Sequence, residues 1–160
     1  MKEPEILIAE KGDSHCIKVV GRATIAISAP VRQFVQDIER DEDNKGVSIN
    51  LADCEGMDST FMGILAMMAL KLRKKGITVK IIKSGNNKKL LDGLGLSKLF
   101  EYLDDDDGTV LWKKIAIDNT SSAASSETVL DAHRTLMEAD EGNITKFKNV
   151  VDMVEREIKK

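Results

Sequence analysis

The feature that most constrains the fold is a helical segment, residues 60–75, that is apolar over most of its circumference. It ends in three cations, Arg73, Lys74 and Lys75, followed by Gly76. Cations favour the negative end of a helix dipole, and glycine favours the position just after the last turn. The pattern therefore predicts a helix that ends at Gly76. Because it is apolar nearly all round, this helix has to lie well inside the fold.

β-type runs lie on both sides of this helix. VSINLAD (47–53) is apolar at alternating positions, and ITVKIIK (77–83) follows the glycine. A strand–helix–strand unit predicts two parallel strands joined by a right-handed crossover. Nearer the N-terminus, the runs at 5–10 and 15–20 are separated by a Gly/Asp turn, which predicts an antiparallel hairpin.

Two further helices and one further strand complete the expected sheet domain. The first helix is expected to have Ser28 as its N-cap and Pro30 in its first turn, and its apolar positions are Val31, Phe34, Val35 and Ile38. A short helix is expected at 86–93 and a further strand at 109–117. The order of elements predicts an α/β fold with one mixed sheet and helices on one or both faces.

The composition changes after residue 117. Residues 118–126 (DNTSSAASS) are small and polar, which is typical of a linker. Two helices are expected beyond it, at 127–140 and 144–159. The second carries a narrow apolar seam at Ile144, Phe147, Val151, Val154 and Ile158. His133 falls on the apolar stripe of the first, which indicates a core or interface histidine.

A helical pair this short cannot bury its seam and be stable alone. It has to dock on the sheet domain, on a second copy of the chain or on a partner. We therefore expect three parts: a domain over 1–117, a linker over 118–126 and a C-terminal helical hairpin over 127–160.

Composition excludes several classes of function. The chain has 160 residues and a net charge of -3, which argues against a nucleic-acid-binding protein. No apolar run reaches the roughly 20 residues of a membrane span, and the first residues do not open a signal peptide. Cys16 and Cys54 have neither metal-site nor redox spacing, so two free thiols in a reducing cytosol are expected. No metal or cofactor is expected.

The motif Asp58-Ser59-Thr60 stands directly before the apolar helix. One interpretation is structural, since Asp58 and Ser59 are both residues that cap helices well. The other is a switch, because a phosphate on a hydroxyl in the first turn meets free backbone N–H groups and the positive end of the dipole. Such a phosphate adds about -1.5 to -2 charges, which can spoil an apolar docking surface without unfolding the domain. The two roles are compatible.

The sequence resembles a STAS domain, the family of bacterial anti-sigma factor antagonists. The resemblance covers roughly residues 5–105 and rests on NLADCEGMDST, the apolar helix, the Gly76 turn, ITVKIIK and LLDGLGLSKLF. In that family the serine after the aspartate is phosphorylated by a kinase that is also the anti-sigma factor. The resemblance implies Ser59 as phosphoacceptor, with Thr60 as second choice.

One position departs from the family pattern. The first glycine of the signature is Phe61 here, while the second is kept as Gly63. Glycine would let a partner backbone approach closely. Phe61 either turns inward to the core or offers an apolar contact to a different partner. The partner-binding surface that the resemblance implies consists of Asp58, Ser59, Thr60, Phe61, Met62 and Gly63.

The expected function is that of a cytoplasmic anti-sigma factor antagonist that works by phosphorylation-controlled partner switching. Its partners would be an anti-sigma factor with serine kinase activity and a PP2C-like phosphatase. The alternative is a STAS scaffold, or an accessory subunit of a signalling or transport complex, with its contacts through the C-terminal hairpin. A homodimer through that hairpin is also possible. The chain shows no catalytic Ser/His/Asp set, metal spacing or phosphate-binding loop, so no enzymatic activity of its own is expected.

Overall fold

The computed structural model describes residues 3–105, 108, 110–116 and 122–159. Its sheet has the strand order β6-β5-β3-β2-β1-β7, and β4 pairs with β2 off this path. The strands are β1 (Glu5–Lys11), β2 (Ser14–Ala23), β3 (Gly46–Asn50), β4 (Cys54–Met57), β5 (Val79–Ile82), β6 (Phe100–Leu103) and β7 (Lys113–Ile115). The helices are α1 (Ile25–Arg40), α2 (Ser59–Arg73), α3 (Asn87–Gly93), α4 (Ser122–Ala139) and α5 (Gly142–Ile158), with a short 3₁₀ turn at Ser97–Leu99.

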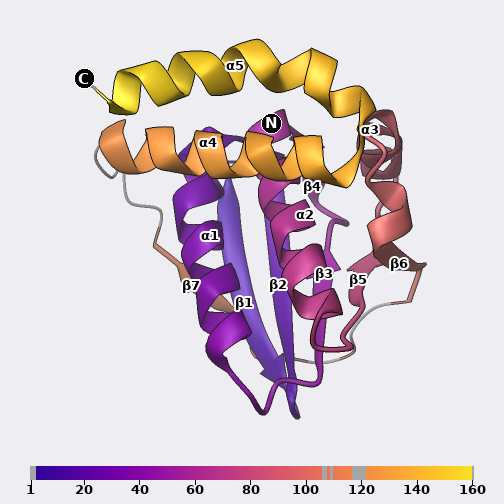
Figure 1. Ribbon diagram of the computed structural model, residues 1–160. Coiled ribbons are helices and arrows are strands. Elements are labelled where there is room, and N and C mark those ends of the chain that lie inside the picture. Colours follow the sequence, from indigo (N-terminus) through magenta and orange to yellow (C-terminus); the bar gives the residue numbers. More distant parts are fainter. Residues whose placement is uncertain (1–2, 106–107, 109, 117–121, 160) are drawn as a thin grey trace.

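The predicted α/β architecture with a mixed sheet is confirmed. Strands β1 and β2 form the expected antiparallel hairpin, paired from Glu5↔Val20 to Lys11↔Ser14. The pairs β2–β3, β3–β5 and β5–β6 are parallel, as crossovers through α1, α2 and α3 require. Helices α1 and α2 lie side by side on one face of the sheet (Figure 1). The core therefore forms between these two helices and the central strands.

Helix α1 begins earlier than predicted, and the expected cap was wrong. Thr24 is the N-cap, and its hydroxyl accepts a hydrogen bond from Ala26 N at 3.3 Å. Ser28 lies inside the helix, where its Oγ donates to Thr24 O at 2.9 Å. Pro30 is in the helix interior and not in the first turn. The earlier start places fully buried Ile27 on the apolar face, which extends the buried stripe by one turn.

The apolar helix is where the sequence predicts it. Helix α2 runs from Ser59 to Arg73, and its side chains are buried through most of its length. Two strands were missed next to it. β4 has no apolar alternation and was taken as part of the loop before α2, and β6 was taken as the end of a turn. Both are short, four-residue strands, and their pairing partners lie far away in the sequence.

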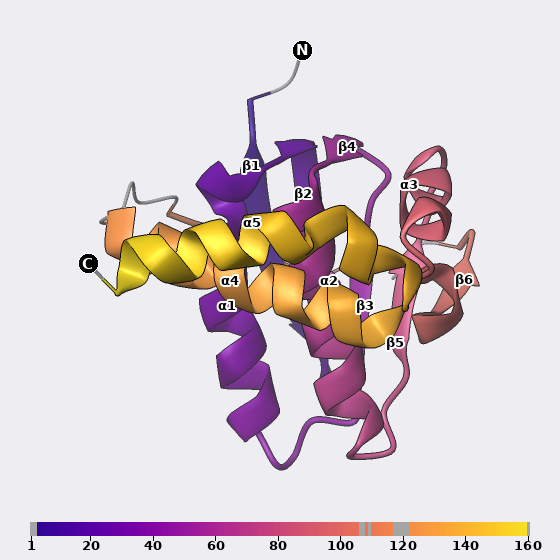
Figure 2. The ribbon, with the colours of Figure 1, turned by 45° about the horizontal axis from the view of Figure 1, so that its top comes forward.

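The C-terminal helices α4 and α5 form an antiparallel pair, the C-terminal hairpin (residues 122–159). Helix α4 begins at Ser122, inside the segment expected to be a linker. Of the three docking sites that the sequence left open, the structure has the first, because α4 packs on α2 and α1 of the same chain. Helix α5 packs on the outer side of α4 (Figures 1 and 2). The hairpin thus lies across the ends of α1 and α2.

Candidate functional site

The start of α2 is fixed by Asp58. Its Oδ1 accepts a hydrogen bond from Phe61 N at 2.8 Å, and its Oδ2 accepts one from Ile25 N at 2.9 Å. One carboxylate therefore caps α2 and also binds the first residue of α1. Asp58 alone is the cap, and Ser59 is the first residue of the helix, so a capping role for Ser59 was wrong.

Residue Ser59 is half-buried, and its Oγ lies 2.9 Å from Nε2 of His133 on α4. Nδ1 of the same ring lies 2.7 Å from Val129 O. A backbone carbonyl can only accept, so Nδ1 carries a proton, and in the neutral ring Nε2 then accepts the hydroxyl proton of Ser59. The ring is 4% exposed and packs against Phe147 of α5, with the ring centroids 4.9 Å apart. Both helices of the hairpin therefore contribute to the cover over Ser59.

The next three residues of the motif point away from solvent. Thr60 is 6% exposed, Phe61 is fully buried in the core, and Met62 is 6% exposed. Of the two alternatives for Phe61, the structure has the inward one. Of the two hydroxyl-bearing residues, Ser59 is the more exposed.

At Gly63, helices α2 and α4 approach each other closely. A Cβ built on Gly63 would lie 2.5 Å from Ala132 O and 2.7 Å from Ala132 Cβ. No side chain fits that space, so glycine is required here for the two helices to pack. The backbone that comes close to the motif glycine is that of the chain's own C-terminal hairpin.

Polar contacts fix the hairpin at its edges. Arg32 of α1 pairs with Asp131 of α4. At the other end, Asn143 Nδ2 donates to Leu94 O at 2.9 Å, and Lys146 Nζ donates to Gly93 O at 2.8 Å. The hairpin is therefore anchored to α1, α2 and the turn after α3. Within the motif, it contacts Ser59 through His133 and Gly63 through Ala132.

Other residues near the site do not form a reactive centre. Both cysteines are free. Burial raises the pKa of the Cys54 thiol, whose Sγ lies 3.4 Å from Gly56 O, so this thiol is not activated as a nucleophile. Within the described ranges, no group of three or more His, Cys, Asp or Glu side chains is placed to hold a metal ion. In those ranges, no helix has the length and apolar character needed to cross a membrane.

The architecture is that of known solved structures. No protein-family model matches the sequence, and no curated protein matches it. One solved structure, the anti-sigma factor antagonist SpoIIAA in its unphosphorylated form, superposes with a TM-score of 0.55 at 12% identity, over 64% of this chain and 90% of that one. The fold is that of a STAS domain.

A second solved structure supports the same fold. A Thermotoga maritima protein assigned as an anti-sigma factor antagonist superposes with a TM-score of 0.54 at 18% identity, over 61% of this chain and 85% of that one. Both matches span most of the neighbour but leave more than a third of this chain outside. The STAS-like part is therefore nearly a whole neighbour, and this chain adds further structure to it.

Sequence reasoning located the motif but missed the residues that cover it. His133 is 74 positions from Ser59, and no local pattern links the two. Its place on the apolar stripe of α4 indicated a buried or interface histidine, which is what the structure has. Its partner could not be inferred because the docking site of the hairpin was itself open.

Proposed function

We propose that this protein is an anti-sigma factor antagonist whose binding face is switched by phosphorylation of Ser59. The observation that carries the proposal is the position of Ser59 Oγ, in the first turn of α2 of a STAS fold, half-buried while neighbouring Thr60 is buried. The two solved neighbours are described as anti-sigma factor antagonists, one of them in its unphosphorylated form.

The chemistry requires only an acceptor from this chain. The partner kinase supplies ATP and Mg²⁺; a bond forms between Ser59 Oγ and the γ-phosphorus, and the bond from that phosphorus to the departing ADP oxygen breaks. The hydroxyl proton leaves to a base of the kinase or to solvent. A PP2C-like phosphatase would hydrolyse the product and return the hydroxyl.

The new charge would act on the start of α2. A phosphate of about -1.5 to -2 charges is stabilised by the helix dipole there, yet it places charge beside an apolar docking face. The two oxygens of Asp58 are already bonded to backbone N–H groups, so the carboxylate stays as the cap. The partner's affinity would fall while the sheet domain keeps its fold.

Phosphate mapping tests the proposal directly. The purified full chain is incubated in native lysate with ATP and phosphatase inhibitors, and the modified residue is located by mass spectrometry. We expect modification at Ser59, loss of it in Ser59→Ala, and retention in Thr60→Val. If Ser59→Ala still acquired phosphate at full stoichiometry, Ser59 would not be the phosphoacceptor.

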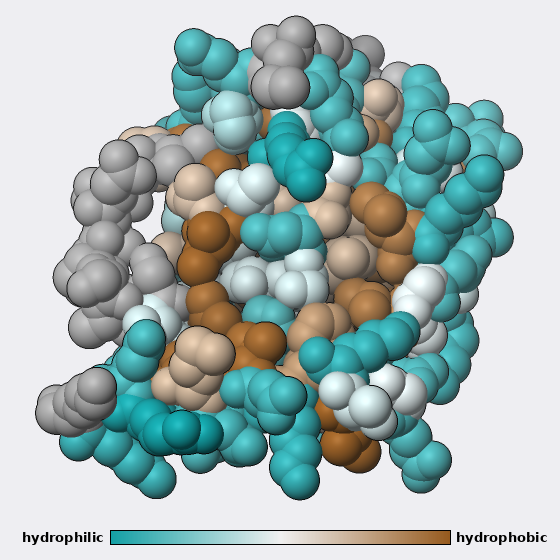
Figure 3. Space-filling view, turned by 90° about the horizontal axis from the view of Figure 1, so that it is seen from above, coloured by the Kyte–Doolittle hydropathy of each residue, from teal (hydrophilic) through white to brown (hydrophobic). Residues whose placement is uncertain are grey.

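A second function is favoured by one observation on the hairpin. Large apolar side chains stay exposed on α5, namely Ile144, Met153 and Ile158. The space-filling view from above shows hydrophobic patches interspersed with hydrophilic side chains at this end of the molecule (Figure 3). A scaffold or accessory subunit would use such a surface for lasting contacts and would keep its partner in Ser59→Asp. A switch would lose its partner in that variant.

A further inference from the structure

We infer that the C-terminal hairpin is an internal occupant of the docking face, and that a docked hairpin and a phosphate on Ser59 exclude each other. The hairpin then sets how often the face is open to the kinase and to any other partner. This inference rests on the proposed function, because it describes how that face is regulated.

The first step is the space around Ser59 Oγ. His133 Nε2 lies 2.9 Å from that oxygen, and its ring is 4% exposed beneath Phe147 of α5. With the Ser59 side chain directed at α4 as it is here, a phosphoryl group bonded to Oγ would overlap the volume in which this ring lies. Phosphorylation therefore requires α4 to have moved away, and the phosphate then prevents its return. The same cover keeps a kinase from a hydroxyl that already donates to His133.

The second step is the backbone contact at Gly63. Ala132 is fully buried, and its carbonyl and Cβ fill the space beside the glycine. A partner that uses this face has to displace α4, since two backbones cannot occupy the same groove. The hairpin and the partner therefore compete for one surface.

The third step is the composition of the hairpin contact, which suits a reversible interface. Of the buried hairpin residues, Ala132 and Leu136 join the core of the sheet domain, while Thr128, His133 and Asn143 are polar. Interfaces of this mixed kind resemble transient contacts between domains. Arg32 Nε and Asn143 Oδ1, both at the hairpin contact, are buried with no hydrogen-bond partner among the described residues. Docking that leaves polar atoms unpaired is less favourable than its buried area suggests.

Competition has a quantitative consequence. A partner that binds only the open form has its apparent affinity reduced by the fraction of molecules that are open. Phosphorylation by the kinase is slowed by the same fraction when opening is fast. Any variant that loosens the hairpin should raise both the apparent affinity for the partner and the rate of phosphorylation.

The test places a phosphate on the full chain without any kinase. Phosphoserine is incorporated at position 59 (Ser59→phosphoserine), and amide hydrogen exchange is compared by mass spectrometry with the unmodified chain. We expect exchange in α4 and α5 to rise at least about tenfold, because their protection comes from docking, while β1, β2 and β3 keep their protection. The matched control is Ser84→phosphoserine, in the partly exposed turn before α3, which should leave the hairpin unchanged. Unchanged exchange of the hairpin in Ser59→phosphoserine overturns the inference.

A second variant keeps the test decisive if the phosphate destabilises the whole chain. Ala132→Leu cannot pack against Gly63 and should open the hairpin without a charge, whereas Glu138→Leu, on the exposed side of α4, should not. If Ala132→Leu and the phosphate both act by opening the hairpin, their effects on stability are not additive. The phosphate at position 59 should therefore lower the urea midpoint of the native chain and have little effect in the Ala132→Leu background. An equal loss in both backgrounds places the clash inside the sheet domain and overturns the inference.

These measurements separate the inference from the proposed function. Neither uses a kinase, so a hairpin that stays docked defeats the inference and leaves phosphorylation of Ser59 standing. If Ser59 acquired no phosphate in native lysate, even in the Ala132→Leu variant with its open face, the proposed function would be wrong. The exclusion between hairpin and phosphate, tested by hydrogen exchange and urea unfolding, would still stand.

Discussion

Asp58 ties together the N-terminal ends of helices α1 and α2. Its carboxylate bonds Phe61 N in α2 and Ile25 N in α1, at 2.8 Å and 2.9 Å. We predict that Asp58→Ala lowers the free energy of unfolding by about 1–2 kcal/mol, as loss of a helix cap does. Urea unfolding monitored by circular dichroism measures it. Asp58→Asn keeps one acceptor oxygen and should lose less. A midpoint for Asp58→Ala equal to that of the native chain would contradict this assignment.

Phe61 has a structural role in spite of its place in the motif. It is fully buried in the core, where the resemblance leads one to expect glycine at a docking surface. We predict that Phe61→Ala lowers the free energy of unfolding by about 3–5 kcal/mol through the cavity it leaves. Met153→Ala, at a side chain that is 58% exposed, is the control and should change it by less than about 0.5 kcal/mol. Urea unfolding measures the free energy of unfolding of both variants. A small effect of Phe61→Ala would show that the Phe61 side chain is not in the core.

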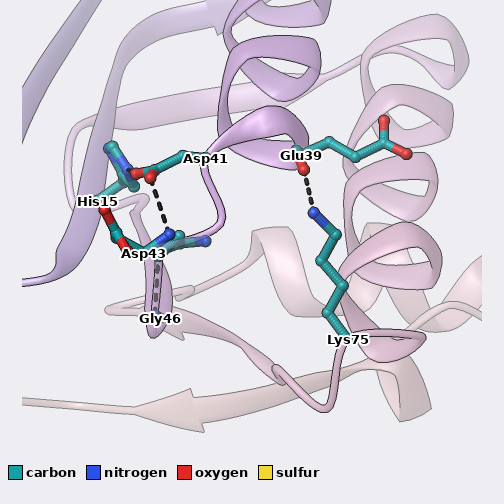
Figure 4. A network of polar contacts seen from close by, with 7 residues as sticks. His15, Glu39, Asp41, Asp43, Gly46 and Lys75 are labelled. Carbon is teal, nitrogen blue, oxygen red and sulfur yellow. Dashed lines mark hydrogen bonds and ion pairs between the residues drawn. The ribbon is translucent and has the colours of Figure 1, made fainter.

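Asp41 gives the chain a defined response to acid. Its Oδ2 lies 2.8 Å from His15 Nε2, and its Oδ1 accepts from Asp43 N at 3.1 Å (Figure 4). The hydrogen bond from His15, and then that from Asp43, lower the pKa of Asp41 below its ordinary value of 3.8. The unfolded chain thus takes up this proton first as the pH falls. The stabilisation is complete above pH 3.8 and is lost as the pH drops through the lower, folded-state value.

We therefore predict that the urea midpoint of the native chain falls more steeply below about pH 4 than that of Asp41→Asn. Titrations between about pH 2.5 and pH 6 measure the two slopes. Asp104→Asn, at an exposed position, is the control and should follow the native curve. Parallel curves for the native chain and Asp41→Asn would mean that the contact with His15 does not persist in solution.

At the level of single residues, the sequence located the Asp58-Ser59 helix start but not the side chain that covers Ser59. Ser59 and Asp58 could be found because they precede an apolar helix in consecutive positions. The contact of Ser59 with His133 depends on where a separate pair of helices docks, and nothing in either local segment encodes that position. The inward turn of Phe61 likewise depends on the space left by neighbouring core side chains.

At the level of elements, the spacing of apolar residues predicted the helices and strands that are buried on one face or all round. Helix α2 and the β1–β2 hairpin belong to this group, since their patterns are long enough to be unambiguous. Strands β4 and β6 were missed because four residues cannot establish a period of two, and their pairing is decided by β2 and β5. The N-terminal part of α4 was taken as linker because its serines and alanines are small and polar on average, although alanine also favours helix.

At the level of the whole molecule, the chain consists of a STAS-like sheet domain and a helical hairpin, whose helix α4 packs on α2 and α1. The sheet domain has its own core between the sheet and helices α1 and α2. The hairpin contributes a few buried residues to that core, chiefly Ala132 and Leu136. Regions with fewer buried apolar contacts open at lower free energy than the core does. The two parts should therefore open separately.

We predict that native-state hydrogen exchange in increasing urea shows the hairpin opening below the global unfolding free energy, as the lowest cooperative step among α1, α2, α4 and α5. Leu136→Ala should accelerate exchange in both α4 and α5, because removing a fully buried side chain costs about 2–5 kcal/mol of docking. Glu138→Ala, at an exposed position of α4, should leave the exchange rates of both helices unchanged. Convergence of the hairpin and the sheet on a single opening step would mean that the hairpin is an inseparable part of the core. If the face under the hairpin opened only on global unfolding, neither a partner nor a phosphate could expose it. The measurement therefore tests the proposed regulation as well as the folding of the chain.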